Sequence, residues 1–209
     1  VKKKIVDSKL KAIEHLSKAD KCLAAIIKSV GVYDIKVRSD PFRSLVESIV
    51  YQQLSGSAAD AILSRFVGIY SIFPLPNQVL STSDKKLKEI GLSARKIEYV
   101  KNLCSHIVDR SLDLDLLPKM DDEEVISQLT NLKGIGRWTA EMFLIFHLGR
   151  PDVLPLTDLG LRKAIQKAYL LQELPSAATM LKLAEPWRPF RSIATWYLWK
   201  SLSQFKGIG

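Results

Sequence analysis

The segment LKGIGRWTAEMFLIF (132–146) begins with two glycines separated by one residue and continues in an apolar helical pattern. The preceding segment DDEEVISQLTN (121–131) places Val125, Ile126 and Leu129 on one helical face. The sequence therefore predicts two helices, within about 122–148, joined by a tight turn that contains glycine.

The two glycines in this turn need a physical reason, because glycine costs about 1 kcal/mol relative to alanine inside a helix. Gly134 and Gly136 allow positive φ and a close approach of another backbone. The N–H groups at the start of the second helix, with the positive end of its dipole, form an anion site. Lys133 and Arg137 add positive charge beside it. The alternative is an ordinary glycine-capped turn between two helices.

Composition places this chain of 209 residues among globular proteins with an anionic partner. Lys and Arg outnumber Asp and Glu by 31 to 22, which favours nucleic acid. Two cysteines, Cys22 and Cys104, are too few for a four-thiolate iron–sulfur cluster, and the three histidines lack metal-ligand spacing. No apolar run reaches the length of a membrane span or resembles a signal peptide. We expect an intracellular monomer that requires no cofactor.

Helical spacing of apolar residues recurs along nearly the whole chain, as in FRSLVESIVYQQL (42–54), and no strand alternation is evident. Six helix starts are signalled by capping residues, namely Asp40, Ser83, Ser93, Asp121, Asp158 and Ser176. The sequence predicts an all-α fold of ten to twelve helices forming one unit over 1–209. We expect the N- and C-terminal helices in one lobe, the middle helices in another, and a cleft between them.

LKGIGRWTA resembles the helix-hairpin-helix element of the base-excision DNA glycosylase superfamily, and other segments agree with this resemblance. SIVYQQLSGSAA (48–59), GLSARKIEYV (91–100) and WRPFRSIATWYLWK (187–200) resemble further family motifs, and the match covers about 40–200. Trp138, followed by an aspartate twenty residues later, resembles the 3-methyladenine DNA glycosylase II branch. The resemblance implies base excision repair of damaged double-stranded DNA, in the nucleus if the source is eukaryotic.

Asp158 is the candidate catalytic residue. Its local pattern is that of a helix N-cap, and from the neighbouring residues alone this structural interpretation is favoured. The helix N–H groups that hold a cap would also keep the carboxylate ionised. Such a carboxylate can stabilise the cationic, oxocarbenium-like sugar formed when a base leaves deoxyribose. The resemblance carries the family's essential aspartate onto this residue.

Trp138 and Phe42 are assigned to the base pocket. In endonuclease III-like relatives a lysine stands at the place of Trp138 and forms a Schiff base with the sugar, which an indole cannot do. The resemblance thus implies a monofunctional glycosylase without lyase activity. Trp138 can stack on a cationic alkylpurine, although core packing on an apolar helical stripe is an equal alternative.

The segment YQQLSGSAA predicts a corner between two helices, where a side chain can fill the gap left by a flipped base. By resemblance, Leu54 is the wedge and Gln53 lies beside it to touch base edges. The alternative is that Leu54 completes the core face of a helix over 41–54.

The remaining assignments concern the DNA backbone and the segment at the C-terminal end. The predicted backbone contacts are Ser93, Lys96, Lys133, Gly134, Ile135, Gly136, Arg137 and Thr139; for the first two, a solvated helix end is an equal alternative. The resemblance implies Na⁺ or K⁺ held by the backbone carbonyls of Thr130, Leu132 and Ile135. The aromatic residues of 187–200 are expected to pack, while Arg188 and Arg191 either meet DNA or brace the Asp158 loop.

Two functions remain open from the sequence. The first is a monofunctional glycosylase that removes alkylated purines of the 3-methyladenine type. The second is a weakly active or non-excising paralogue that binds abasic or distorted DNA. Both would keep every motif named above. A third interpretation, a helical interaction module with a chance glycine turn, would predict no binding to duplex DNA.

Overall fold

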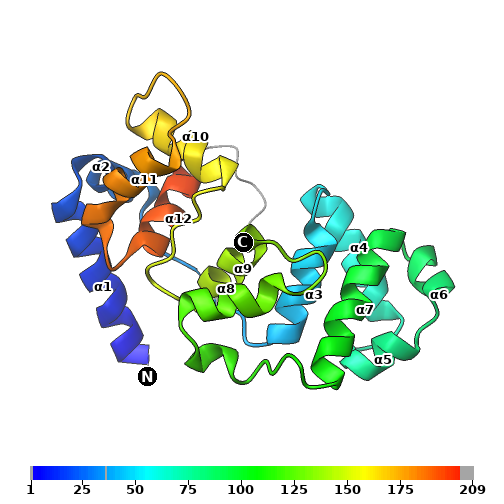
Figure 1. The fold of residues 1–209 in the computed structure, drawn as a ribbon. Coiled ribbons are helices and arrows are strands. Elements are labelled where there is room, and N and C mark those ends of the chain that lie inside the picture. The colour runs from blue at the N-terminus through cyan, green and yellow to red at the C-terminus, as the bar shows by residue number, and fades with distance from the viewer. Residues whose placement is uncertain (1, 36, 203–209) are drawn as a thin grey trace. The chain divides into compact units, whose positions relative to one another are not determined.

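The computed structural model describes residues 2–35 and 37–202. These residues form helices joined by irregular segments, with no strand among them, as the sequence predicts. They contain twelve α-helices and two 3₁₀-helices (Figure 1). The chain divides into two compact units: unit 1 comprises Val1–Val37 and Gly149–Gly209, and unit 2 comprises Arg38–Leu148. Each unit is described by itself.

Unit 1 is built from helices at both ends of the chain. They are α1 (Lys2–Ala19), α2 (Lys21–Val30), α10 (Leu159–Ala168), α11 (Ala177–Ala184), η2 (Glu185–Trp187) and α12 (Arg191–Ser201). Helix α2 packs on α1 and α12, and α12 packs on α10. The carboxylate of Asp20 ties these elements together, because it caps α2 and also accepts hydrogen bonds from Tyr169 and Trp187.

Unit 2 consists of the helices from the middle of the chain. They are α3 (Pro41–Tyr51), α4 (Gly56–Gly68), α5 (Pro76–Ser81), α6 (Asp84–Glu89), α7 (Ala94–Val108), η1 (Leu117–Lys119), α8 (Asp122–Thr130) and α9 (Arg137–Phe146). Helix α7 packs against α3, α5 and α6, while α8 pairs with α9. The apolar face of α3 predicted from the sequence is buried, with Leu45, Val46, Ile49 and Val50 inaccessible to solvent.

The first helix of unit 2, α3, ends before the apolar helical pattern of 42–54 does. Helix α3 ends at Tyr51, because Gln52 leaves the helical conformation with φ −53° and ψ 128°, and Gln53 has a φ of 58°. Leu54 therefore lies beyond the helix and is 39% exposed, which excludes the alternative that it completes the core face.

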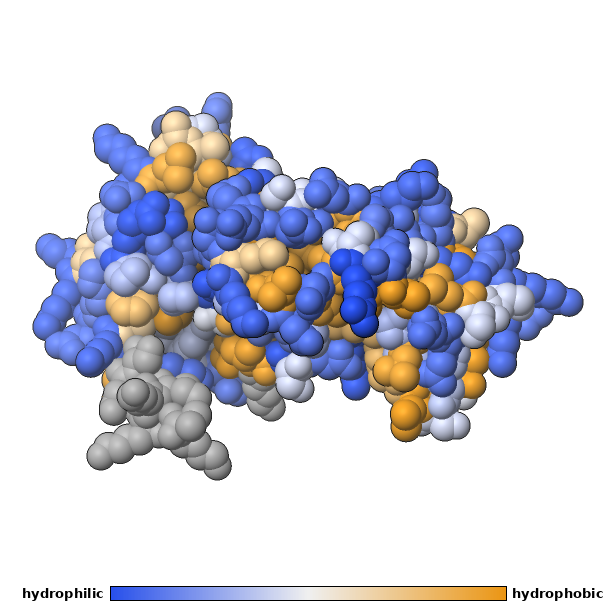
Figure 2. Space-filling model, turned by 60° about the horizontal axis from the view of Figure 1, so that its bottom comes forward, coloured by the Kyte–Doolittle hydropathy of each residue, from blue (hydrophilic) through white to orange (hydrophobic). Residues whose placement is uncertain are grey.

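Hydrophilic residues cover most of the face shown in Figure 2, and apolar residues form smaller patches between them. Within the described part of the chain, no helix has the length and apolarity needed to cross a membrane.

Candidate functional site

The two glycines of the predicted hairpin have different structural reasons. Gly134 has a φ of +83°, and a Cβ at this residue would lie 2.1 Å from the ring of Tyr99. Gly136 has an ordinary φ of −93°, and a Cβ there would meet no atom within 4 Å. The first glycine is required by the protein's own packing. The second leaves open space at the start of α9, where another molecule can approach.

Helix α7 contacts the hairpin through three of its side chains. The backbone N–H of Lys133 donates to Oδ1 of Asn102 at 2.9 Å, and its ammonium contacts Glu98 at 2.7 Å. The ring of Tyr99 also packs against Gly134, so three residues of α7 contact two consecutive residues of the hairpin. The segment GLSARKIEYV and its continuation thus form the platform on which the hairpin rests.

The start of α9 presents backbone N–H groups beside a charged network. Gly136 is the N-cap and supplies no side-chain cap. The guanidinium of Arg137 contacts Glu123 and Glu141, and the hydrogen bonds with Glu123 raise the pKa of Arg137. Thr139 is buried, and its contact with the DNA backbone stays a prediction. The predicted DNA contacts of Arg137 and Lys133 must compete with these acidic partners within the chain.

Trp138 and Phe42, the two predicted pocket residues, lie in different environments of unit 2. Among the four tryptophans, all within the described residues, Trp138 alone is exposed, at 40%. This exposure excludes core packing as its explanation. Phe42 is buried at the start of α3, and its ring packs edge to face on Phe73 at 5.8 Å between centroids. Phe42 thus has a packing role in unit 2, and its role in a base pocket stays a prediction.

A tight turn follows α3 and carries the predicted wedge. The N–H of Leu54 donates to the carbonyl of Tyr51 at 3.3 Å. Gln52 has φ −53° and ψ 128°, and Gln53 has positive φ, as in a type II turn. A type II turn favours glycine at the position of Gln53, so a glutamine there stores local strain. This strained turn presents Leu54 to solvent.

Ser93 and Lys96, the other predicted backbone contacts, both have partners within the protein. The hydroxyl of Ser93 caps α7 by accepting the N–H of Lys96. The ammonium of Lys96 donates to the carbonyl of Val50 at 2.6 Å, and burial lowers the pKa of this lysine. Lys96 therefore caps the C-terminal end of α3, where a cation also complements the helix dipole.

Asp158 lies in unit 1 as the N-cap of α10, as the sequence predicts. It is 8% exposed, and its Oδ1 accepts hydrogen bonds from the N–H of Leu161 and from Nε1 of Trp199, the latter at 2.8 Å. A buried carboxylate held by N–H donors from two helices is fixed in orientation. A carboxylate fixed in this way can stabilise a positive charge that develops nearby.

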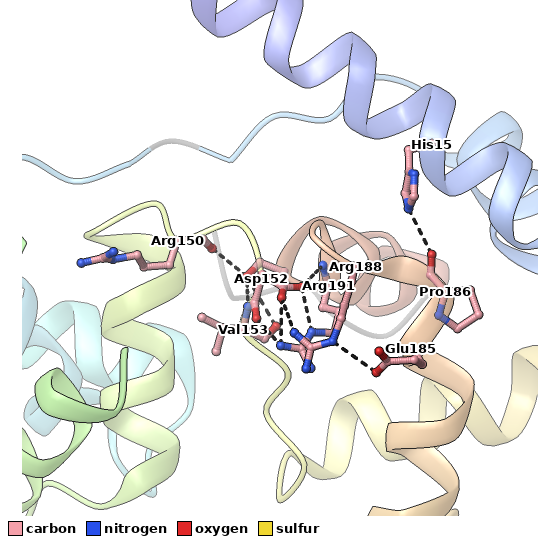
Figure 3. Close-up of polar contacts among 9 residues, drawn as sticks. His15, Arg150, Asp152, Val153, Glu185, Pro186, Arg188 and Arg191 are labelled. Carbon is pink, nitrogen blue, oxygen red and sulfur yellow. Dashed lines mark hydrogen bonds and ion pairs between the residues drawn. The ribbon is translucent and has the colours of Figure 1, made fainter. Parts of the chain in front are cut away.

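The loop that leads to Asp158 is braced by the start of α12 (Figure 3). The guanidinium of Arg191 donates to the carboxylate and to the carbonyl of Asp152, and Arg188 contacts the same carboxylate at 2.8 Å. The hydroxyl of Ser192 donates to the carbonyl of Arg150 and accepts the N–H of Val153. Of the two alternatives left open by the sequence for these arginines, the structure shows the brace.

We expect Arg191→Lys to lower the free energy of unfolding by about 1–3 kcal/mol, because lysine cannot reproduce a forked contact to Asp152. Arg188→Lys is the matched control, since Arg188 is about half exposed and contacts the same carboxylate with one nitrogen. Chemical denaturation measures both changes. Equal losses in the two variants would contradict a special role for Arg191.

The described residues contain no group of three or more His, Cys, Asp or Glu side chains that could hold a metal ion. The carbonyls proposed for a monovalent cation lie where α8 ends. Thr130 is the last residue of α8, and the carbonyl of Leu132 accepts one N–H from Ile135, which leaves it a second lone pair. The carbonyl of Thr130 lies at the C-terminal, negative end of the α8 dipole, which suits a cation, while the cation site formed with Leu132 and Ile135 stays a prediction.

Three residues of these arrangements were not assigned from the sequence. Trp199 was expected only to pack, yet it donates to Asp158 across 41 residues of chain. Gln52 donates to the carbonyl of Gly134 across 82 residues, and Asn102 accepts from Lys133 across 31. No local pattern marks these contacts, because each partner lies on a different element.

Comparisons with known proteins agree with this arrangement of elements. A family model described as HhH-GPD superfamily base excision DNA repair protein matches residues 46–189. The chain is 36% identical to DNA-3-methyladenine glycosylase 1 of Schizosaccharomyces pombe, over 96% of this chain and 90% of that protein. It is 32% identical to the alkylbase DNA glycosidase-like protein mag2 of the same organism, over 91% of this chain and 92% of mag2.

Solved structures give the same result. The S. pombe 3-methyladenine DNA glycosylase Mag1 in complex with abasic DNA superposes with a TM-score of 0.84 and 35% identity, covering 95% of this chain and all of that one. A DNA-3-methyladenine glycosidase from Bacillus halodurans superposes with a TM-score of 0.82 and 38% identity, covering 94% of this chain and 90% of that one.

Proposed function

Because this chain belongs to the HhH-GPD superfamily of base excision DNA repair proteins, we propose that it is a monofunctional DNA glycosylase. It hydrolyses the N-glycosidic bond of alkylated purines of the 3-methyladenine type in duplex DNA and leaves an abasic site. The observation that carries this proposal is the fixed, buried carboxylate of Asp158. Support also comes from relatives whose names state this activity and whose length the chain spans almost completely.

The proposed reaction requires one carboxylate. Departure of the base leaves a positively charged, oxocarbenium-like sugar, and Asp158 stabilises this charge and positions water for attack. An alkylated purine already carries a positive charge, so it leaves as a neutral base without protonation by a second acid. Trp138 cannot form a Schiff base with the sugar, so the strand stays intact. Its exposed indole can stack on the cationic base.

The proposed DNA contacts lie in unit 2. Gly136 and the first N–H groups of α9 receive a phosphate, a contact that positions the enzyme without reading sequence. Leu54 enters the base stack, and Gln53 lies beside it. The carbonyls of Thr130, Leu132 and Ile135 would hold Na⁺ or K⁺, which would add positive charge next to the phosphate. The proposed reaction takes place on chromosomal DNA, in the nucleus if the source is eukaryotic.

Release of free base from methylated duplex DNA by the purified protein tests this function. Strand integrity is measured before and after alkali, since an abasic site breaks only in alkali. Base release with an intact strand is the expected result. Direct strand cleavage would contradict the monofunctional mechanism. No release from any alkylated duplex, combined with tight and salt-sensitive binding of abasic duplex, would select the non-excising alternative.

Trp199→Phe is expected to lower the single-turnover excision rate by about tenfold or more, because hydrogen bonds to charged groups contribute about 1.5–3 kcal/mol. Trp199 acts here as a positioning residue for Asp158. Trp196→Phe is the matched control, since it makes the same change one helical turn away at similar burial. Equal excision rates in the two variants, measured at equal folded fraction, would contradict this role.

A further inference from the structure

The wedge turn, defined as residues 51–54, is connected to the hairpin by one side chain. Nε2 of Gln52 donates to the carbonyl of Gly134 at 2.8 Å, and this contact is partly buried. Gln52 and Gly134 both lie in unit 2, at turns that follow α3 and α8. The hydrogen bond therefore joins the element proposed to enter the base stack to the element proposed to hold the DNA backbone.

Each of the two joined elements is also fixed to α7. Lys96 of α7 donates to the carbonyl of Val50, one residue before the wedge turn begins. Tyr99 packs under Gly134, and Asn102 accepts the N–H of Lys133. Helix α7 thus supports the base of the wedge turn and the hairpin separately. The tip of the turn, from Gln52 to Leu54, lies beyond the Lys96 contact.

The tip of the turn needs support of its own. Gln53 holds a positive φ that is unfavourable for a residue with a side chain, and Leu54 is an apolar side chain exposed to solvent. Residues held in such conformations persist when neighbouring contacts impose them. The hydrogen bond from the side chain of Gln52 to the carbonyl of Gly134 connects this tip to the hairpin.

We propose that Gln52 is a positioning residue that holds Leu54 at a fixed distance from the hairpin, so that wedge insertion and backbone anchoring occur in register. This inference rests on the proposed function, because it concerns how that function distinguishes an abasic or flipped nucleotide from intact duplex. The hairpin anchors any duplex through its backbone, whereas insertion of Leu54 is favourable only where the stack can open. Loss of the Gln52 contact should therefore weaken discrimination and spare general DNA binding.

Gln52→Met tests this role, since methionine has a similar length but cannot donate to the carbonyl of Gly134. The expected result is an affinity for abasic duplex, and a single-turnover excision rate, that fall by about tenfold, the upper range for one neutral hydrogen bond. Affinity for undamaged duplex should change less than about twofold, because phosphate contacts supply non-specific binding. Gln128→Met is the matched control, because Gln128 is an exposed residue of α8.

A second pair of variants separates positioning from a general loss of structure. In a Leu54→Ala background, Gln52→Met should cause no further loss of discrimination, because residues that act as a unit are not additive. Gln52→Lys keeps a donor at this place and should retain the ratio of abasic to undamaged affinity. The free energy of unfolding is measured for every variant, so that a folding defect is recognised.

The outcomes distinguish this inference from the proposed function. A wild-type protein that prefers abasic duplex, with an unchanged ratio in Gln52→Met, would overturn only the role of Gln52. Additive effects of Gln52→Met and Leu54→Ala would also overturn it, since Gln52 would then act through another group. A wild-type protein that releases free base but shows no preference for abasic duplex would overturn the role of Gln52 and leave the proposed function standing. A wild-type protein that neither releases base nor prefers abasic duplex would overturn both proposals.

Discussion

Asp158→Asn is expected to reduce the single-turnover rate of base excision by at least about 100-fold, while abasic duplex still binds. Removing one group that stabilises charge in a transition state typically costs this factor. Asparagine has nearly the shape of aspartate and is itself a favoured N-cap, so α10 should keep its start. The substitution therefore removes the negative charge and leaves the cap, and it separates the structural interpretation of Asp158 from the catalytic one.

The environment of Asp158 explains why the expected effect is large. The carboxylate is almost fully buried and is fixed by the N–H groups of Leu161 and Trp199, so it requires little reorganisation during the reaction. Charges act more strongly where water is excluded. A neutral amide at this position cannot offset the charge of an oxocarbenium-like sugar.

Asp121→Asn is the matched control for this experiment. Asp121 is the N-cap of α8 and accepts the N–H of Glu124, so it has the same capping role in the other unit. We expect the excision rate of the Asp121→Asn variant to stay within about twofold of wild type, because asparagine replaces aspartate as a cap at little cost. Unchanged excision in Asp158→Asn would exclude the proposed mechanism.

Gly134→Ala is expected to destabilise the hairpin strongly and to weaken binding of every duplex, whereas Gly136→Ala should leave the fold intact. At Gly134, positive φ alone costs alanine about 1 kcal/mol or more. The added methyl group would also overlap the ring of Tyr99, so the hairpin or α7 must move. At Gly136 neither problem arises, and any loss of DNA affinity would report the approach of the DNA backbone itself.

Chemical denaturation and salt-dependent duplex binding measure both glycine variants. Combining Gly134→Ala with Tyr99→Ala should recover part of the lost stability, because the overlap is then removed while the positive φ remains. A Gly134→Ala variant as stable as wild type would contradict the packing of Tyr99 on the hairpin. Duplex affinity unchanged by Gly136→Ala would argue that the DNA backbone does not approach the start of α9.

Much of the fold follows from local patterns. All six capping residues proposed as helix starts are N-caps in the structure, including Asp40, Asp121 and Asp158. These predictions succeed because a cap and the first turn of its helix lie within four residues. The hairpin was predicted on the same grounds, from a capped helix, two glycines and a second apolar stripe.

Predictions that depend on contacts between residues distant in sequence were less complete. The helical period of 42–54 continues through Leu54, but the helix ends at Tyr51, and Gln52 in the turn beyond it donates to the hairpin. The sequence places Lys96 in the first turn of a helix with an exposed start. In the structure its ammonium caps α3 by donating to the carbonyl of Val50. From the sequence, Arg191 is equally a DNA contact or a brace of the Asp158 loop. Its hydrogen bond to Asp152 shows the brace.

The sequence by itself determined the all-helical class, the helix starts, the hairpin and the aspartate at the start of α10, because each depends on spacing within one or two turns. Only the tertiary structure decided that Trp199 orients Asp158, that Tyr99 requires Gly134 to be glycine, and that Gln52 reaches the hairpin. The hydrogen bonds of Trp199 and Gln52 span 41 and 82 residues of chain, and packing rather than local propensity brings such distant residues together.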